Sequence, residues 1–553
     1  DRDGRLLVQN MPVYDLMIVP KEAKNPDTLA FCRVFNIPVE EFRERIKTAK
    51  KYSYVKPSPF LTRLSTKEFA AVQEYLPDFP GFYINARTVR GYTHQSLAHA
   101  LGYIGEISPG RLAKPEYARY LPGDYLGISG IESEYEDFLM GKRGVKYKMV
   151  NVRGIDKGPF KEGEFDTLSI AGQNLVSTID LKLQQYGEKL MAGKIGSVVA
   201  IEPATGEILA YISAPGYDPN LLTGKEMGNN YMALQRDPMK TLFNRPIMAT
   251  YPPGSIFKLV QALIAMQEGV ITHNTGFPCN QNLVKCSHGH EAPTNLRIAI
   301  KHSCNPYFYQ VFRNLINQGR SRNTFVDSRL GLDKWREHVL TFGFGDKLGI
   351  DLPNEKKGII ASSKLYDKYY GENRWKFSNF YSVSIGQGET GTTPLQMANL
   401  MAIMANRGFY YTPHIIRSVG ENGKPLPEYS KKHYTSVDQK YFEPVLDGME
   451  DVVARGTGIY AKLAHVGITV LGKTGTAENP HGDDHADFVA FAPRNDPKIA
   501  IAVYIENAGF GAISSAPLAG LMIEKYLTDT ISKPRKAWED WVMAGQFKPK
   551  KKH

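Results

Sequence analysis

The sequence predicts an α+β fold in which helices surround an antiparallel sheet, joined to a separate N-terminal module. The chain has 553 residues, which exceeds one ordinary core and indicates two or three domains. Two apolar segments, 197–201 and 208–212, flank a turn with Pro203 and Gly206, as in a β-hairpin. A helix-compatible run at 256–266 follows, and we expect this helix to pack against the hairpin.

The N-terminal module is predicted to cover residues 1–175. Residues 13–19 alternate like a strand, 40–51 and 68–75 have helical patterns, and 127–136 opens another helix. No set of residues suited to catalysis occurs in this region. It therefore either positions the rest of the chain, contacts a partner, or acts as a spacer.

Residues 176–535 are predicted to form the second domain, and residues 536–553 a C-terminal tail. The second domain should contain a helix from Asp180 to about Leu190, a buried helix from Pro394 to Asn406, strands at 485–493 and 499–504, and a closing helix at 518–527.

The net charge of +11 indicates an affinity for anionic surfaces, and part of it lies in the basic end, Lys548–His553. Nucleic-acid binding is disfavoured because no zinc-finger, RNA-recognition or helix-turn-helix pattern occurs. No run of 18 or more apolar residues occurs either. Asp1–Val8 resembles the middle of a β-hairpin with Asp3-Gly4 as its turn, from which we expect an anchor helix before it.

The pair most suited to catalysis is Ser255 and Lys258, in the segment Tyr251–Lys258. Side chains three residues apart lie on one face of a helix. A serine becomes a nucleophile when a base takes its proton, and a lysine can do so if burial keeps its amine neutral. Taken alone, Ser-x-x-Lys also fits a capped helix with a solvated lysine.

Two later motifs favour catalysis. Ser303-Cys304-Asn305 comes first, and Lys473-Thr474-Gly475-Thr476 follows on an expected edge strand whose glycine lets a ligand approach closely. The lysine and the threonine hydroxyls suit a substrate carboxylate. Gly386-Gln387-Gly388 lacks the surroundings of a phosphate-binding loop, so we exclude a nucleotide site.

A cluster of cysteine and histidine lies near the middle motif. It comprises Cys279, Cys286, His288, His290 and Cys304. Three thiolates and one imidazole would make a closed tetrahedral zinc site, which would stiffen the catalytic loop. A disulfide, or unrelated buried thiols and surface histidines, are the alternatives. The fourth cysteine, Cys32, is expected to be a small buried residue.

With these motifs together, the chain resembles the class B penicillin-binding proteins, and among them the cell-elongation type. The resemblance runs over nearly the whole chain. It rests on Phe243–Pro246, Tyr251–Ser255, Ser303–Asn305 with Tyr307–Gln310, Gly386–Gly388 and Lys473–Thr476. It implies a penicillin-binding/β-lactamase-like transpeptidase domain on an elongated N-terminal pedestal of the dimerisation type, to which Asp1–Gly4 and Gly130–Glu132 are similar.

The resemblance also implies residue roles. Ser255 would attack the penultimate D-Ala carbonyl of a peptidoglycan stem peptide, and Lys258 would take its proton. Ser303 and Asn305 would relay protons and hold the substrate amide, while Lys473 would orient the site.

In the last motif, Thr474 would orient the site together with Lys473, and Thr476 would bind the terminal carboxylate; Thr474, Gly475 and Thr476 are the implied substrate-binding residues. The backbone N–H groups of Ser255 and Thr476 would form the oxyanion hole. β-Lactams would acylate Ser255 and stay bound.

Some members of the family carry zinc beside the middle motif, which favours a structural zinc here and no organic cofactor. The implied ligands are Cys279, Cys286, His288 and Cys304, with His290 as the rival to His288. Asp487 departs from the family, where a tryptophan often precedes the strand, and this leaves the outer rim of the cleft undefined.

The implied partners are peptidoglycan stem peptides, a membrane glycosyltransferase of the SEDS family and elongation scaffold proteins. The implied location is the periplasmic side of the inner membrane. Rival functions are a β-lactamase, a penicillin sensor or a non-catalytic scaffold, and a division-type penicillin-binding protein.

Overall fold

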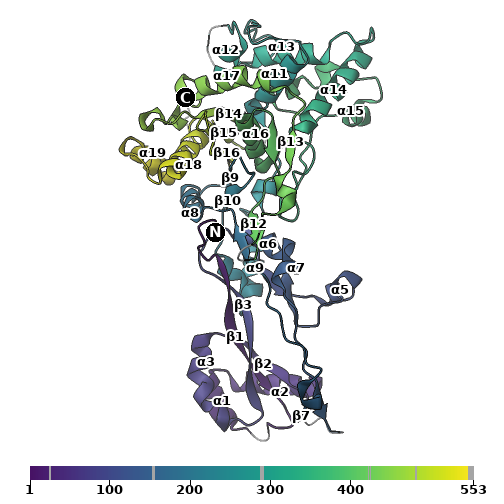
Figure 1. The fold of residues 1–553 in the computed structure, drawn as a ribbon, viewed down its shortest axis with the longest axis vertical. Coiled ribbons are helices and arrows are strands. Elements are labelled where there is room, and N and C mark those ends of the chain that lie inside the picture. Colours follow the sequence, from purple (N-terminus) through teal and green to yellow (C-terminus); the bar gives the residue numbers. More distant parts are fainter. Residues whose placement is uncertain are drawn as a thin grey trace.

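The computed structural model describes residues 1–545 except 24–25, 152–155, 287–289, 291, 421–422, 424 and 480–481. The molecule is elongated (Figure 1). A slender N-terminal module occupies one end and a broad domain of sheet and helices the other, with the N-terminus between them. The predicted basic end, Lys548–His553, lies outside the described residues.

Two long antiparallel strands form the stalk of the N-terminal module. β1 (Val8–Ile18) pairs with β3 (Phe82–Tyr92) along its whole length, and β2 (Ser58–Leu64) pairs with the other edge of β1. A head of three helices closes the far end: α1 (Thr28–Phe35), α2 (Val39–Tyr52) and α3 (Thr66–Val72). Cys32 is buried in its phenylalanine-rich core, as predicted.

Short elements follow the stalk along the chain, some beside the broad domain and the last of them back near α2 at the far end (Figure 1). They are α4 (Ala98–Leu101), β4 (Ile104–Glu106), α5 (Pro109–Leu112), β5 (Tyr125–Gly127), α6 (Gly130–Glu134), α7 (Glu136–Leu139), β6 (Lys148–Val150) and β7 (Asp156–Pro159). The helix predicted to open at 127–136 and to end near 139–141 is thus two short helices.

The expected hairpin around Asp3-Gly4 is wrong. The Asp1 carboxylate accepts hydrogen bonds from the backbone N–H groups of Asp3, at 3.0 Å, and Arg5, at 2.7 Å. These local bonds use donors that strand pairing would need, so a turn forms and the first strand begins at Val8.

A five-stranded antiparallel sheet forms the centre of the broad domain, in the order β10-β9-β16-β15-β14. The strands are β9 (Gly196–Ile201), β10 (Ile208–Ala214), β14 (Leu471–Ala477), β15 (His485–Ala492) and β16 (Ile499–Ile505). The predicted hairpin, the two later strands and the edge position of β14 are confirmed. Most residues of these strands are buried because helices cover both faces.

Different helices cover the two faces of the sheet. On one face α16 (Pro394–Asn406) packs against β9, β15 and β16, and its start is fixed by a capping box between Thr393 and Gln396. On the other face lie α18 (Ser515–Thr528) and α8 (Leu181–Leu190), the latter capped by Asp180. These three helices were predicted.

The expected packing of the Ser255 helix against the β9–β10 hairpin is wrong. A tight turn, Gly254–Phe257, contacts β14, and α11 (Lys258–Gln267) packs instead on α13 (Asn305–Ile316) and α17 (Phe442–Arg455). The buried helix α16 occupies the position over the sheet because it is apolar on nearly every side.

The remaining elements surround this core. They are β8 (Leu175–Ser177), α9 (Met227–Arg236), α10 (Arg245–Met248), α12 (Leu296–Lys301), α14 (Thr324–Thr341), α15 (Ser363–Tyr370), β11 (Phe409–Tyr411), β12 (Ile416–Val419), β13 (Lys432–Tyr434) and α19 (Lys533–Ala544). Within the described part of the chain, no helix combines the length and apolar character needed to cross a membrane.

The segment predicted as a tail from residue 536 is partly helical. α19 packs against α18 and α8, and Val542 is buried in the same core as those helices. The Arg535 guanidinium donates to the carbonyl of Tyr460 at 2.7 Å. Residues 536–544 therefore belong to the folded domain.

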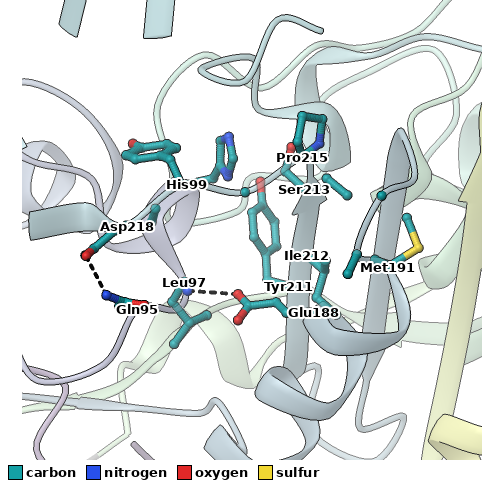
Figure 2. A pocket seen from close by; sticks show the side chains of 16 residues that line it. Gln95, Leu97, His99, Glu188, Met191, Tyr211, Ile212, Ser213, Pro215 and Asp218 are labelled. Atoms are coloured by element: carbon teal, nitrogen blue, oxygen red, sulfur yellow. Dashed lines mark hydrogen bonds between the residues drawn. The ribbon is translucent and has the colours of Figure 1, made fainter. Parts of the chain in front are cut away.

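The N-terminal module meets the broad domain beside α8 and β10, where a cavity of about 340 Å³ lies between them (Figure 2). At its border the Glu188 carboxylate accepts the Leu97 N–H at 3.0 Å, and Gln95 donates to Asp218 at 2.9 Å. Both hydrogen bonds join the N-terminal module to the broad domain.

Candidate active site

The turn that carries Ser255 is held between two other segments. The Gly254 N–H donates to the carbonyl of Gly386 at 2.9 Å. A Cβ at Gly386 would lie 2.1 Å from the Gly254 oxygen, so this approach requires glycine. On the other side, the Thr476 nitrogen lies 3.2 Å from the position of a Cβ at Gly254. The turn therefore sits against both β14 and the Gly386–Gly388 loop.

Lys258 follows on the first turn of α11 and is completely buried. Its Nζ lies 2.9 Å from Ser255 Oγ, 2.5 Å from Asn305 Oδ1 and 2.8 Å from the Ser303 carbonyl oxygen. Burial lowers the pKa of Lys258 to about 7, and the nearby thiols Cys286 and Cys304 act in the opposite direction. A large fraction of this amine is thus uncharged at neutral pH, next to the hydroxyl that it can deprotonate.

Ser303 joins two amines. Its Oγ lies 3.2 Å from Lys258 Nζ and accepts a hydrogen bond from Lys473 Nζ at 2.9 Å. Its backbone has a φ of +55°, a left-handed conformation that costs a non-glycine residue about 1 to 3 kcal/mol. This conformation brings the side chain and the carbonyl of one residue to the same lysine.

Lys473 on β14 is also completely buried. Burial and the charge of Lys258 lower its pKa well below the usual lysine range, and the charge of Asp487 opposes them. The Thr474 hydroxyl is hydrogen-bonded to Thr457 Oγ1 at 2.8 Å, and Gln387 Nε2 donates to the Thr476 carbonyl at 3.2 Å.

The structure brings the five predicted catalytic side chains into one hydrogen-bonded network: Ser255, Lys258, Ser303, Asn305 and Lys473. Gly475 lies on the same strand. Thr457 and the Lys285 carbonyl, which accepts the Asn305 amide at 2.8 Å, were not predicted. Neither belongs to a sequence pattern, so only the fold reveals them.

Asp487, the residue that departs from the family pattern, does not lie on an exposed rim of the cleft. It lies within β15 opposite Gly475 and is only 3% exposed.

The thiols of the predicted metal site converge beside the network. The ligand atoms of Cys279, Cys286, His290 and Cys304 all lie within 4.8 Å of one another. The imidazole in this group is that of His290, the rival in the sequence prediction, and His288 lies outside the described residues. None of the four cysteines is part of a disulfide, which contradicts the disulfide alternative.

This donor set fits zinc. Three sulfur atoms and one imidazole nitrogen make the Cys3His set of structural zinc sites. His290 Nε2 lies 3.2 Å from Cys286 Sγ and 3.7 Å from Cys279 Sγ, spacings compatible with ligands of one small ion. Cys304 stands between Ser303 and Asn305, so the cluster is attached directly to the catalytic loop.

Comparison with known proteins covers both modules. The family model described as "Penicillin binding protein transpeptidase domain" matches residues 196–524. The model described as "Penicillin-binding Protein dimerisation domain" matches residues 1–177.

Relatives and solved structures agree. The chain is 32% identical to the peptidoglycan D,D-transpeptidase MrdA of Acinetobacter baumannii, over 95% of this chain and 79% of the relative. It is also 32% identical to MrdA of Haemophilus influenzae, over 97% and 84%.

Among solved structures, PBP2 in complex with MreC from Helicobacter pylori matches with a TM-score of 0.77 and 26% identity, covering 96% of this chain and 97% of that one. Pseudomonas aeruginosa PBP2 in complex with WCK 5153 matches with a TM-score of 0.65 and 30% identity, covering 80% and 91%. The chain therefore belongs to the penicillin-binding protein transpeptidase family.

Proposed function

We propose that this chain is a serine D,D-transpeptidase that cross-links peptidoglycan stem peptides during cell elongation through an acyl-enzyme on Ser255. The observation that carries the proposal is the buried amine of Lys258, 2.9 Å from Ser255 Oγ, with a pKa lowered to about 7. A neutral amine at hydrogen-bond distance is what general-base activation of a serine requires.

In the proposed reaction, Ser255 Oγ attacks the carbonyl carbon of the penultimate D-Ala while its proton passes to Lys258 Nζ. The C–N bond to the terminal D-Ala then breaks, and the leaving amine takes a proton. Ser303 Oγ, which contacts both lysine amines, offers the route for that proton. An amine of a second stem peptide then attacks the ester, forms the cross-link and returns the proton to Ser255.

The remaining groups position the substrate. Asn305 is held between Lys258 and the Lys285 carbonyl, so its amide has a fixed orientation toward the stem peptide. Lys473 on β14 would supply a positive charge beside Ser303. The partly exposed hydroxyl of Thr476 is proposed to bind the terminal carboxylate of the substrate. The backbone N–H groups of Ser255 and Thr476 are proposed as the oxyanion hole.

Acylation by a penicillin tests this proposal. Intact mass spectrometry should show one penicillin adduct per chain, and peptide mapping should place it on Ser255. Ser255→Ala should abolish the adduct, since the other hydroxyl beside the Lys258 amine, Ser303 Oγ, is also bound by Lys473 Nζ and is assigned here to proton transfer. Stoichiometric labelling of the alanine variant would show that the nucleophile is wrongly assigned.

Two further assays, cephalosporin hydrolysis and cross-linking of stem peptides, separate the rival functions. A β-lactamase would hydrolyse a chromogenic cephalosporin continuously, whereas the transpeptidase should release product only once per chain on the time scale of labelling. A penicillin sensor would be acylated and yet form no cross-linked dimer from stem peptides. The MrdA relatives, at 32% identity over most of the chain, favour the elongation type over the division type.

We also propose that the Cys279–Cys286–His290–Cys304 cluster binds one structural zinc ion. The support is the Cys3His donor set and its convergence to within 4.8 Å. When bound, zinc would supply folding energy and no step of acyl transfer. These four residues would connect the loop before α12 to the start of α13.

The proposed partners follow from the family. The PBP2 of Helicobacter pylori was solved in complex with MreC, which supports an elongation scaffold as a partner of this chain. A SEDS glycosyltransferase would supply the glycan strands that are cross-linked. The proposed place of action is the periplasmic face of the inner membrane, where stem peptides are found.

A further inference from the structure

A buried carboxylate, Asp487, lies beside the Lys473–Thr476 strand and has no part in the reaction described so far. Asp487 stands opposite Gly475 in the β14–β15 pair and is 3% exposed. A Cβ at position 475 would lie 2.1 Å from Asp487 Oδ2. The carboxylate therefore occupies the space that the glycine of the Lys-Thr-Gly motif leaves open.

In the part of the chain that the structure describes, no other residue donates a hydrogen bond to this carboxylate. Among the described residues, neither Asp487 oxygen finds a partner outside its own residue, and the buried Tyr504 hydroxyl opposite it on β16 has none either. Asp487 and Tyr504 border a small cavity of about 10 Å³ that also touches Tyr251 and Ile256 of the nucleophile segment. A buried, unpaired carboxylate is costly, so its charge needs compensation from a nearby cation.

Lys473 is that cation. Residues directly opposite in an antiparallel pair share a face, so Lys473, Gly475, Asp487 and Val489 all project from the same side of β14 and β15. Burial raises the pKa of Asp487, and the positive charge of Lys473 opposes that effect. Burial and the positive charge of Lys258 lower the pKa of Lys473, and the negative charge of Asp487 opposes both effects.

We infer that Asp487 is a positioning residue that keeps the proton on Lys473 and thereby leaves Lys258 as the uncharged amine beside Ser255. The inference rests on the proposed function. Lys258 and Lys473 share Ser303 Oγ, at 3.2 and 2.9 Å, and two ammonium groups at this separation repel each other. The negative charge of Asp487 favours the protonated form of Lys473 over that of Lys258. The positive charge then lies on the amine that is proposed to bind the substrate carboxylate.

Other titratable groups face this cluster from the neighbouring elements. They are Lys258 at the start of α11, Tyr251 before it, Tyr504 with Glu506 on and after β16, and the thiols Cys286 and Cys304 on the side of Lys258. Glu506 is the other carboxylate on this side, but it accepts the Tyr251 hydroxyl at 2.7 Å and is paired with Arg245 at 3.0 Å, whereas the negative charge that acts on Lys473 is that of Asp487.

The pH profile of acylation tests the inference. The second-order rate constant of Ser255 acylation by a penicillin is measured by intact mass, in the full chain, from about pH 6 to about pH 10. The wild-type rate should fall on the alkaline side as Lys473 loses its proton. Asp487→Asn and Asp487→Leu should both move this fall downward by about 1 to 2 pH units, because each removes the same charge.

Tyr504→Phe is the matched control, since it changes the same small cavity without removing a charge, and its alkaline limb should stay at the wild-type position. If Asp487→Asn does not fold, Asp487→Leu removes the charge without burying an unpaired amide. A lower melting temperature with an unmoved alkaline limb would mean that Asp487 is only structural and would overturn the inference. A wild-type chain that is not acylated at Ser255 would instead refute the proposed function.

Discussion

Replacing Lys258 with methionine is expected to lower the rate of Ser255 acylation by a penicillin by about 10²- to 10⁴-fold, the range of a lost general base. Methionine keeps an unbranched chain in the buried position, but it has no amine 2.9 Å from Ser255 Oγ. It also leaves Asn305 Oδ1 and the Ser303 carbonyl without their shared donor. The rate is measured by the growth of the covalent adduct in intact mass spectra.

Lys285→Met is the matched control for this variant. Lys285 lies near the site, but its main-chain carbonyl rather than its side chain holds Asn305, and its side chain is exposed. Acylation of the control should stay within about twofold of the wild type, as expected for a surface change. A Lys258→Met variant that is acylated as fast as the control would exclude Lys258 as the base.

Loss of the proposed zinc ion is expected to slow acylation by about 10- to 100-fold, the usual cost of disturbing groups that support a site. Cys279→Ala removes one ligand of the cluster at the residue farthest along the chain from the catalytic motif. The loop it belongs to contains the Lys285 carbonyl, which holds the Asn305 amide at 2.8 Å. Without the ion this loop is no longer tied to Cys304, and Asn305 loses its fixed orientation.

Elemental analysis and acylation kinetics on the same preparation check this result. The wild type should contain about one equivalent of zinc per chain, and Cys279→Ala much less. Cys32→Ala is the control, because this thiol is buried in the head of the N-terminal module, far from the cluster. Metal loss without any change in the acylation rate would break the proposed link between the cluster and Asn305.

The parts of the site that the sequence could predict are those that depend on local spacing. Ser255 and Lys258 are three residues apart, and one helical turn is enough to bring their side chains together. The start of the helix Pro394–Asn406 is predictable from the capping residues Thr393 and Gln396 and from the proline at its first position. Such signals need no knowledge of the rest of the chain.

The parts that escaped prediction depend on how distant segments pair. The burial of Asp487 follows from the register of β14 with β15, and a shift of one residue would have turned the side chain to the other face. The Thr457–Thr474 bond joins two segments through the fold, and no pattern marks Thr457. The packing of α11 on other helices was missed because a second apolar helix, α16, competes for the same face of the sheet.

The choice between the two histidines shows the same limit. His288 and His290 are two residues apart, and by sequence distance either could be the fourth zinc ligand beside the three cysteines. The described structure brings His290 to Cys286 and Cys279, a result of the path of the loop rather than of composition.

The most direct test of the central claim, a neutral lysine as the base for Ser255, is the acid limb of the wild-type acylation rate. A protonated amine cannot accept the serine proton, so the rate should rise with pH and reach half of its plateau at about pH 7, the lowered pKa of Lys258. A rate that still climbs through about pH 9 to 10, as for an ordinary lysine, would contradict the account.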